Sequence, residues 1–592
     1  MQSHPLPTPQ FPQSDRRARV LDHCTAVDDL FAAYTRRLHM PGVAYGVVMD
    51  GELVYANGVG VRNVATGAPV TADSVFRIAS MTKSFTALAV LQLRDAGKLR
   101  LDEAAATYVS ELADLIYPNG DAAPITVRQL LAMAPGWPQD DPWADRQLYR
   151  TDADLSALYR QGVTFSNPPG VTFEYSNMAY IVLGRIITNV AQMPALAYIT
   201  ARILRPLGMD ATVWNAADVP AEHLAIGHRW EDDAWRGEEL LPSGGDVAAF
   251  AGLFTDLADL ARWVGLFQSG WPPRDDPDDG ILRRASLREM QQVWTMDTPG
   301  LQAASIGRTG AVNAGGYGYG LSMRHNGRYQ TVGHGGGLPG YGSHMRWAPD
   351  YGIGVIALAN VTYANVHAAC RDALDLLITR GDLAPRRVQP APALARARDG
   401  VNRLLAAWDD ALADELFADN FFLDTDRARR RREFTDLHAR HGGLEPDGPL
   451  DAENWLRGRW RMQGARGWCL VWISMAPTVP PRVQALAIDS VLPPSPAMQT
   501  AADGLAALVS HPTLRGLDRL RAADSDRVAL WDQVRLANIL GGPCTVSDVL
   551  DGDGECQACF RFAGEKGSVE VDVRIDEQGK IVDAGFGLVE AL

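Results

Sequence analysis

Alternating apolar and polar positions mark the start of the chain as a β-hairpin. Residues 42–49 and 52–63 form two such runs, and Asp50-Gly51 lies between them. Alternation places every second side chain on one face of a strand, and Asp-Gly is a common turn pair between antiparallel strands. A helical pattern at residues 26–38 precedes the hairpin. The beginning of the chain therefore predicts a helix followed by two paired strands.

Apolar residues that recur at helical spacing characterise the next part of the chain, up to about residue 300. The run from Ser80, SMTKSFTALAVLQLRDAGKL, is apolar on nearly every face and ends at Gly97 beside Lys98. This pattern predicts a buried helix with a glycine stop. Further helices are predicted in TVRQLLAM from Thr126, in NMAYIVLGRIITNVA after Ser176, and in TDLADLARWVGLF from Thr255.

Alternation returns between residues 317 and 360. The runs YGYGLSMRHN, YQTVGHGGG, YGSHMRWAPD and YGIGVIALAN predict consecutive antiparallel strands, and residues 364–379 predict a closing helix. Strands at both ends with helices between them indicate that the terminal segments share one sheet. We therefore predict one domain of the α/β (α+β) class over residues 20–380, with an antiparallel sheet flanked by helices and a helical region. Residues 1–19 are expected to be a flexible N-terminus.

The remainder of the chain follows a Pro-rich stretch at residues 381–400, which we interpret as a linker. Residues 401–592 show helical patterns first and strand patterns later, and then a second passage from helix to strand. This order predicts a C-terminal accessory region of one or two small α+β or β-barrel modules. No internal repeat is evident in the sequence.

Composition and charge exclude several classes of protein. Apolar residues make up 46% of the 592 residues and charged residues 21%, which is typical of a globular protein. The formal net charge of −15 argues against nucleic acid or an anionic membrane as a main partner, because both repel an acidic chain. No apolar run is long enough for a membrane span, and the first twenty residues lack the apolar segment of a signal peptide. We expect a cytoplasmic protein, or a periplasmic or secreted one if a leader was removed.

The cysteines predict neither a disulfide framework nor a metal site. Six cysteines are few for this length, and Cys556 and Cys559 form a lone C-x-x-C pair without nearby histidines. The stretch DGDGE at residues 551–555 lacks the glycine and the distal glutamate of a calcium loop, so a turn is the better interpretation.

Ser80 and Lys83 are candidates for a nucleophile and its proton acceptor. On a helix, residues three apart share one face, and a helix N-terminus offers free N–H groups where an oxyanion would form. A lysine with its usual pKa of about 10.4 is charged at neutral pH, so burial would have to lower the pKa of Lys83. In the alternative interpretation, Ser80 only caps a buried helix.

Two further motifs support chemistry at this pair. Tyr175-Ser176-Asn177 stands directly before an apolar helix, where a phenol and an amide can project into a cleft. The alternative is a packed tyrosine and a helix-capping asparagine. His334 is followed by three glycines inside a strand pattern. Since glycine weakens a strand, this run predicts either that another group approaches the backbone closely or that the strand is bulged or unpaired there.

Taken in order, S-x-x-K, Y-x-N and H-x-G resemble the serine β-lactamase and penicillin-recognising enzyme family. This family includes class C β-lactamases, DD-peptidases, D-aminopeptidases and family VIII esterases, and the resemblance covers about residues 20–380. It implies that Ser80 is the acylated nucleophile and that Lys83 shares its proton network. Tyr175 would be the general base or a proton shuttle, with a phenolate favoured by the nearby lysine.

The resemblance also assigns the groups that would hold the substrate and its oxyanion. Asn177 would hold the substrate amide or the Lys83 head group, and His334, Gly335 and Gly336 would contact the substrate. The backbone N–H groups of Ser80 and Gly337 would bind the oxyanion. It implies an acyl-enzyme that water resolves, and no metal or organic cofactor.

Two departures from the family pattern stand out. Typical β-lactamases have Lys-Thr-Gly at the third motif, whereas His334 is mostly uncharged near pH 7 and should hold a β-lactam carboxylate less well. The H-x-G motif looks more like that of the D-aminopeptidase, DD-peptidase and esterase members, and the C-terminal extension resembles that of the D-aminopeptidases. In LLAMAPGW, Met133, Ala134 and Pro135 replace small hydroxyl residues that are commoner in the family, and the sequence offers no functional account of that change.

The leading hypothesis is a serine hydrolase that cleaves an ester or amide in a small molecule or peptide. D-amino-acid peptides or amides and small carboxylic esters are the expected substrates. The alternatives are a β-lactamase with weak activity and a non-catalytic ligand-binding protein on the same fold. Trp137, Trp143, Tyr149 and Tyr341 are candidates for pocket walls or for core. The sequence leaves open the oligomeric state and the carboxylate that would bind a substrate amine.

Overall fold

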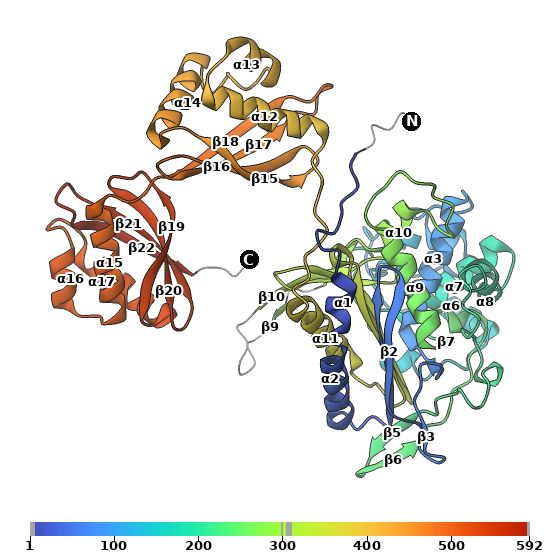
Figure 1. Cartoon of the computed structure of the whole chain (residues 1–592). Coiled ribbons are helices and arrows are strands. Elements are labelled where there is room, and N and C mark those ends of the chain that lie inside the picture. The colour runs from blue at the N-terminus through green and yellow to red at the C-terminus, as the bar shows by residue number, and fades with distance from the viewer. Residues whose placement is uncertain (1–5, 298–299, 303–310, 589–592) are drawn as a thin grey trace. The chain divides into compact units, whose positions relative to one another are not determined.

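The computed structural model of the protein describes residues 6–297, 300–302 and 311–588 (Figure 1). The chain divides into two compact units. The larger unit is Phe11–Arg386, and the C-terminal unit combines Arg387–Leu592 with Met1–Gln10. Of the N-terminus expected to be flexible, residues 1–5 lie outside the described residues, whereas helix α1 (Arg16–Leu21) begins inside it.

A ten-stranded sheet forms the centre of the larger unit. Its strand order is β3-β2-β1-β14-β13-β12-β11-β10-β8, with β9 paired to β10. The strands are β1 (Gly42–Met49), β2 (Glu52–Asn63), β3 (Ala68–Pro69), β8 (Thr295–Met296), β9 (Gly300–Gln302), β10 (Ala311–Tyr317), β11 (Ser322–His325), β12 (Gln330–Leu338), β13 (Tyr341–Ala348) and β14 (Ile353–Ala359). Strand β1 pairs antiparallel with β14, with Val43 opposite Ala359. The prediction that both ends of the domain share one antiparallel sheet is confirmed.

The predicted hairpin is present at Asp50-Gly51. These residues have φ values of 50° and 90°, a left-handed conformation that glycine tolerates freely and aspartate more readily than most residues. The side chains of β1 then alternate between two apolar clusters. Val43 and Val47 pack with Phe31 on one face of the sheet, and Ala44 and Val48 belong to the cluster on the other face.

Helices cover both faces of this sheet. Helices α2 (Cys24–Arg37) and α11 (Val366–Arg380) contribute to the first cluster. Helix α9 (Leu257–Ser269) and the helical region contribute to the second. The helical region contains α3 (Thr82–Asp95), α4 (Val127–Leu131), α5 (Asp141–Ala144), α6 (Asp152–Gln161), α7 (Asn177–Ala191), α8 (Ala195–Ile199) and α10 (Arg284–Met290). Two short strand pairs, β4 (Phe76–Arg77) with β7 (Phe254–Thr255) and β5 (His228–Glu231) with β6 (Ala234–Gly237), complete the unit.

The helices begin where the sequence predicts them, because polar side chains satisfy their free N–H groups. Thr126 accepts a hydrogen bond from the Gln129 N–H and forms a capping box with the Gln129 side chain at the start of α4. Ser176 caps α7, and Asp256 caps α9. Ser80 itself lies in a 3-10 turn (η1, Ala79–Met81) that leads into α3.

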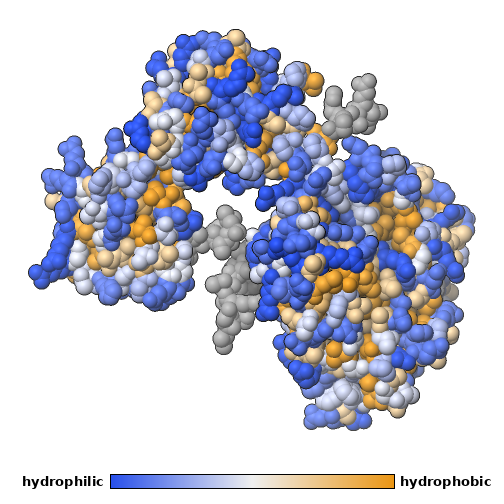
Figure 2. Space-filling model, viewed as in Figure 1, coloured by the Kyte–Doolittle hydropathy of each residue, from blue (hydrophilic) through white to orange (hydrophobic). Residues whose placement is uncertain are grey.

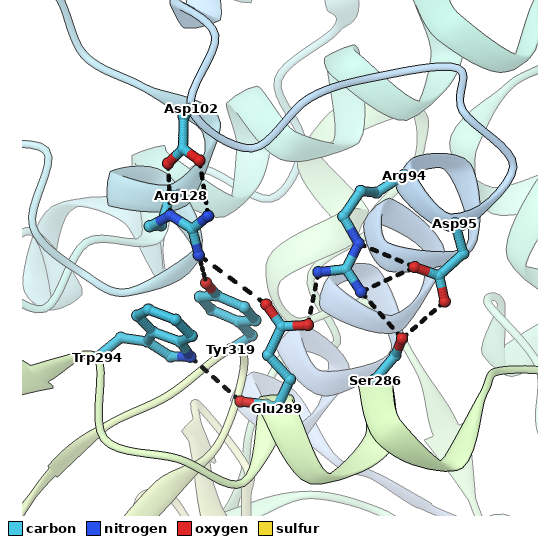
Figure 3. Close-up of polar contacts among 8 residues, drawn as sticks. All are labelled: Arg94, Asp95, Asp102, Arg128, Ser286, Glu289, Trp294 and Tyr319. Atoms are coloured by element: carbon cyan, nitrogen blue, oxygen red, sulfur yellow. Dashed lines mark hydrogen bonds and ion pairs between the residues drawn. The ribbon is translucent and has the colours of Figure 1, made fainter. Parts of the chain in front are cut away.

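A polar network fastens α3 to neighbouring elements (Figure 3). Arg94 near the end of α3 contacts Glu289 of α10 at 2.6 Å. Arg128 of α4 forms a two-pronged ion pair with Asp102 at 2.6 and 2.8 Å, and it also donates a hydrogen bond to the Tyr319 hydroxyl. Glu289 also lies 3.9 Å from Arg128, so the network connects α3 through α10 and Arg128 to Tyr319, just after β10.

The C-terminal unit contains two copies of one arrangement, which is three helices followed by four antiparallel strands. The first copy consists of α12 (Pro392–Ala406), α13 (Asp410–Leu416), α14 (Arg427–His441), β15 (Glu445–Asn454), β16 (Arg457–Gln463), β17 (Trp468–Met475) and β18 (Val483–Val491). The second consists of α15 (Pro496–Ser510), α16 (Leu514–Leu520), α17 (Arg527–Gly541), β19 (Cys544–Gly552), β20 (Gln557–Gly564), β21 (Ser568–Ile575) and β22 (Ile581–Leu588). The linker expected at residues 381–400 includes the boundary between the units and the first residues of α12.

Equivalent contacts show that the two copies share their packing. In the first copy a Cβ on Gly400 would lie 3.0 Å from Leu416, and in the second a Cβ on Gly504 would lie 2.7 Å from Leu520. Each glycine thus lets its helix approach a leucine at the end of the following helix. The sequence shows no evident repeat, so the duplication becomes visible only in the structure. Strands β18 and β19 pair in parallel and join the copies into one eight-stranded sheet.

The surface over α13 and α14 is mostly hydrophilic (Figure 2). It carries the arginine-rich start of α14, where Arg427 and Arg431 form ion pairs with Asp414 and Asp410. Among the residues that the structure describes, no helix combines the length and the apolar character needed to cross a membrane.

Candidate active site

Ser80 and Lys83 meet at the beginning of α3. The Nζ atom of Lys83 lies 2.9 Å from the Oγ atom of Ser80. Ala79, directly before Ser80, has a φ of 50°, which is unfavourable for a residue with a Cβ. Such strain is commonly retained at functional sites, where the surrounding fold holds the chain in place.

Lys83 is fully buried, with 0% of its surface exposed. Its ammonium donates to the Asn177 Oδ1 at 2.6 Å and to the Phe250 carbonyl oxygen at 3.3 Å. Burial lowers the pKa of Lys83 to about 8, and the opposing charges of Asp141, Asp145 and Asp140 limit that fall. A substantial fraction of this lysine is therefore uncharged slightly above neutral pH, as a proton acceptor requires.

The start of α7 leaves Asn177 free to reach Lys83. Ser176 Oγ accepts a hydrogen bond from the Ala179 N–H, and the two carboxylate oxygens of Asp140 accept from the N–H groups of Asn177 and Met178 at 2.7 and 2.8 Å. Capping is thus done by Ser176 and Asp140 rather than by the asparagine side chain. The Asn177 amide instead joins Lys83 to Asp141, whose Oδ1 accepts from Nδ2 at 3.2 Å.

Tyr175 lies beside the same lysine, with its ring centroid 4.9 Å from Lys83 Nζ. Burial raises the pKa of Tyr175 well above its usual value, Asp141 raises it further, and a hydrogen bond with Ser80 opposes the rise. The expectation that the nearby lysine favours a phenolate is therefore wrong. Desolvation and the charge of Asp141 both disfavour the phenolate, so Tyr175 is a neutral phenol that hydrogen-bonds with Ser80.

His334 of β12 is buried and uncharged. Its Nε2 lies 2.9 Å from the Tyr317 hydroxyl, and its Nδ1 lies 2.5 Å from the Gly335 carbonyl oxygen. Burial lowers the pKa of His334 to about 3, and the charge of Lys83 adds to the effect. This agrees with the expectation that the third motif carries no positive charge near pH 7.

The glycines after His334 are needed because other groups approach β12 closely. A Cβ on Gly336 would lie 2.1 Å from the Ile78 carbonyl oxygen, two residues before Ser80. On Gly337 it would lie 2.8 Å from the ring of Tyr363. The prediction of a close approach to this backbone is confirmed, and it brings the glycine segment beside the turn that holds Ser80. The oxyanion role of the Ser80 and Gly337 N–H groups stays a prediction.

The acidic loop before α7, residues 140–145 with the short helix α5, was not expected from the sequence. Asp140, Asp141 and Asp145 come from the run PQDDPWAD, which directly follows the LLAMAPGW segment. All three carboxylates lie within electrostatic range of Lys83. The acidic character of this run was the available signal, but nothing in the sequence shows that the loop folds back towards Ser80.

The unexplained LLAMAPGW segment has a structural role next to the site. Met133 adopts a φ of 58°, its carbonyl oxygen accepts from the Glu174 N–H at 2.9 Å, and its sulfur lies 3.3 Å from the Ser176 N. Met133 thus contacts the chain on both sides of Tyr175, at Glu174 and at Ser176.

The four candidate aromatic residues lie in different surroundings. Trp137 and Trp143 line a cavity of about 420 Å³ that Met178 also borders. Tyr149 lines a second cavity of about 330 Å³. Tyr341 is buried and donates a hydrogen bond to the Ala225 carbonyl oxygen at 2.8 Å, so it is part of the core.

Comparison with known proteins gives the following similarities. A family model described as Beta-lactamase matches residues 27–380. Protein flp of Staphylococcus aureus (strain MW2) is 28% identical over 337 residues, which are 57% of this chain and 62% of that protein. Unguisins hydrolase ungD' of Aspergillus campestris (strain IBT 28561) is 25% identical over 365 residues, which are 59% of this chain and 64% of that protein. The chain thus matches less than two thirds of the length of these relatives.

A solved structure shares the fold of nearly the whole chain. It is the octameric penicillin-binding protein homologue from Pyrococcus abyssi, with a TM-score of 0.51 and 19% identity, covering 95% of this chain and 98% of that one. At this identity the likeness concerns the fold alone.

Proposed function

Since residues 27–380 of this chain belong to the beta-lactamase family, we propose that the protein is a serine hydrolase that cleaves an ester or amide through an acyl-enzyme on Ser80. The observation that carries this proposal is the contact of 2.9 Å between Ser80 Oγ and the Nζ of a fully buried lysine. A lysine buried only for packing would lower the stability of the fold, because desolvation disfavours its charge. Here the same desolvation produces a base close to the nucleophile.

The proposed reaction begins with attack of Ser80 Oγ on the substrate carbonyl carbon. The hydroxyl proton passes to uncharged Lys83, and with a pKa of about 8 about one tenth of the molecules hold this form at pH 7. The proton then passes through the neutral phenol of Tyr175 to the leaving group as the carbonyl–heteroatom bond breaks. Water attacks the resulting ester on Ser80 and releases the acid, with the same groups taking and returning the proton.

Two features support an ester or amide other than a β-lactam as the substrate. The neutral His334 supplies no positive charge for the carboxylate that β-lactams carry. Three carboxylates within electrostatic range of Lys83 also make the site repel an anionic substrate. D-amino-acid peptides or amides and small carboxylic esters remain the substrate classes of the proposal, and efficient turnover of a chromogenic cephalosporin would contradict this choice.

The test compares the wild type with Ser80→Ala on nitrophenyl esters and on D-alanine p-nitroanilide. We expect Ser80→Ala to lower kcat/KM by about 10³-fold or more, because attack depends on the hydroxyl. The melting temperature should stay close to that of the wild type. Ser269→Ala, which changes an exposed serine at the end of α9, serves as the matched control and should keep full activity.

Intact mass after exposure to a fluorophosphonate separates an enzyme from a non-catalytic binding protein. An adduct on the wild type that is missing from Ser80→Ala supports a reactive nucleophile. Undiminished turnover by Ser80→Ala, or a wild type that neither reacts with the probe nor turns over any substrate, contradicts the proposed function.

A further inference from the structure

The acidic loop 140–145 brings more negative charge to the site than the catalytic groups need. Asp140, Asp141 and Asp145 all raise the pKa of Lys83 through their charge. Among the described residues, none of the three forms an ion pair with an arginine, lysine or histidine within 4.0 Å. Lys83 is therefore the cation that these carboxylates share, and it becomes uncharged in the active form of the proposed mechanism.

The three carboxylates differ in the hydrogen bonds that their oxygens accept. Asp140 accepts hydrogen bonds from two backbone N–H groups at the start of α7. Asp141 accepts from Asn177 Nδ2 at 3.2 Å and from Gln139 Nε2 at 2.9 Å. Asp145 is only 3% exposed, yet its hydrogen bond from a described residue comes from one neutral donor, the Tyr363 hydroxyl at 3.0 Å. Asp145 is thus a buried carboxylate without a cation of its own.

Tyr363 places Asp145 opposite the glycine segment of β12. The Tyr363 ring is the group that a Cβ on Gly337 would meet, and its backbone N–H points to the carbonyl oxygens of Leu338 and Tyr341. Its hydroxyl reaches across to Asp145 in the acidic loop. The hydrogen bond therefore links the two sides of the site at the end of β12, and Asp145 and Lys83 influence each other's charge there.

A buried carboxylate is costly unless a cation pairs with it. Burial raises the pKa of Asp145 to about 6, so the group is still mostly ionised slightly above neutral pH. A ligand that brings its own positive charge relieves this cost, whereas a neutral ligand of the same shape does not. Charge at this position therefore discriminates between substrates.

We propose that Asp145, supported by Asp141, selects substrates whose acyl group carries a free cationic amine, as an amino-acid amide or ester does. The inference rests on the proposed function and deepens it. The substrate ammonium then lies beside the Asp145 carboxylate, whose side-chain hydrogen-bond donor among the described residues is the Tyr363 hydroxyl. Asp145 is a specificity residue here and takes no part in bond breaking.

The experiment uses two anilides that differ in one group, D-alanine p-nitroanilide and the p-nitroanilide of propionic acid. The quantity measured is the ratio of their kcat/KM values in the full-length protein. We expect the wild type to favour the amine substrate, and we expect Asp145→Asn to lower the ratio by about tenfold to a hundredfold, since it removes the charge but keeps an acceptor for Tyr363. Asp141→Asn should lower the ratio less.

Two controls separate charge from shape. Tyr363→Phe removes the hydrogen bond but keeps the Asp145 carboxylate, so the ratio should stay within about threefold of the wild type. Asp210→Asn removes one negative charge at an exposed position outside the site and should not change the ratio.

The outcomes distinguish the two proposals. Turnover of both anilides with equal ratios in the wild type and Asp145→Asn overturns the role of Asp145 and leaves the serine hydrolase intact. A wild type that turns over neither anilide and no nitrophenyl ester overturns both. Binding of D-alanine amide and propionamide to Ser80→Ala, measured by calorimetry, gives a second readout, in which preference for the amine must disappear when Asp145→Asn is added.

Discussion

The two units of the chain treat charge in opposite ways. The larger unit buries charged groups near Ser80, among them Lys83 and Asp145. Among the described residues of the C-terminal unit, His441 is the buried polar side chain, and the arginines that form ion pairs lie at or near the surface. Stability alone favours exposed charges, as in the C-terminal unit, because a buried charge loses its hydration. Under the proposed function, the larger unit gives up stability around Ser80 in exchange for groups that can take part in catalysis.

Replacing the buried lysine tests this contrast most strongly. We expect Lys83→Met to lower kcat/KM by about 10³-fold or more, because Ser80 loses its proton acceptor. The same change should raise the free energy of unfolding at pH 7 by on the order of 1 kcal/mol, because desolvation disfavours the Lys83 ammonium by more than the three carboxylates favour it. Activity assays and chemical denaturation measure the two effects.

The size of the stability effect depends on pH. The folded-state pKa of Lys83 is about 8, lower than its usual 10.5, so the folded protein holds this proton less tightly than the unfolded chain. The penalty is fully present below pH 8 and disappears as pH rises towards the unfolded value. The gain from Lys83→Met should therefore shrink between pH 8 and 10. Lys566→Met, at an exposed lysine of the C-terminal unit, should show no such gain, and a wild type more stable than Lys83→Met at pH 7 would contradict the contrast.

The pH profile of the wild type gives a smaller, graded effect. With a neutral ester as substrate, kcat/KM should rise about tenfold per pH unit up to about pH 8 and then level off, as Lys83 loses its proton. His334, with a pKa of about 3, does not titrate in this range. A rate that is flat between pH 6 and 9 would mean that the lysine is not the group whose protonation controls the reaction.

The smallest effect is expected from an exposed ion pair of the C-terminal unit. Asp518 contacts Arg527 at 2.8 Å and Arg521 at 3.1 Å. Because solvent screens such pairs, Asp518→Asn should change the melting temperature by no more than about 2 °C and leave activity unchanged. A large loss of stability would show that charge in this unit matters more than its exposure suggests.

Local patterns made much of the larger unit predictable. Alternation and the Asp50-Gly51 turn predicted the hairpin, and the capping residues Thr126 and Ser176 predicted where α4 and α7 begin. These features depend on neighbours in the sequence, so they can be read without knowing the tertiary structure. Lys83 and Asn177 were likewise recognised from their motifs, and the structure places them in contact.

Features that depend on distant contacts were not predictable. Nothing in the sequence indicates that the loop with Asp141 and Asp145 folds towards Lys83, or that burial keeps Tyr175 neutral. The duplication in the C-terminal unit was hidden for a related reason. In α14 and α17 the buried positions correspond, as with Phe434 and Val534, but the outer face of α14 is rich in arginine whereas that of α17 carries exposed apolar residues. Packing keeps the inner pattern similar, and the outer residues are free to diverge.

The division of the chain also bears on the order in which its parts are made. Residues of the first segment belong to the C-terminal unit: the Pro7 carbonyl oxygen accepts from Trp455 Nε1 at 3.0 Å, and Gln10 pairs with Arg387. During synthesis the larger unit emerges completely before these partners exist, and domains generally fold as units from the N-terminal side. The larger unit can therefore fold first, and Pro7 and Gln10 find their partners only after Arg387 and Trp455 have been made.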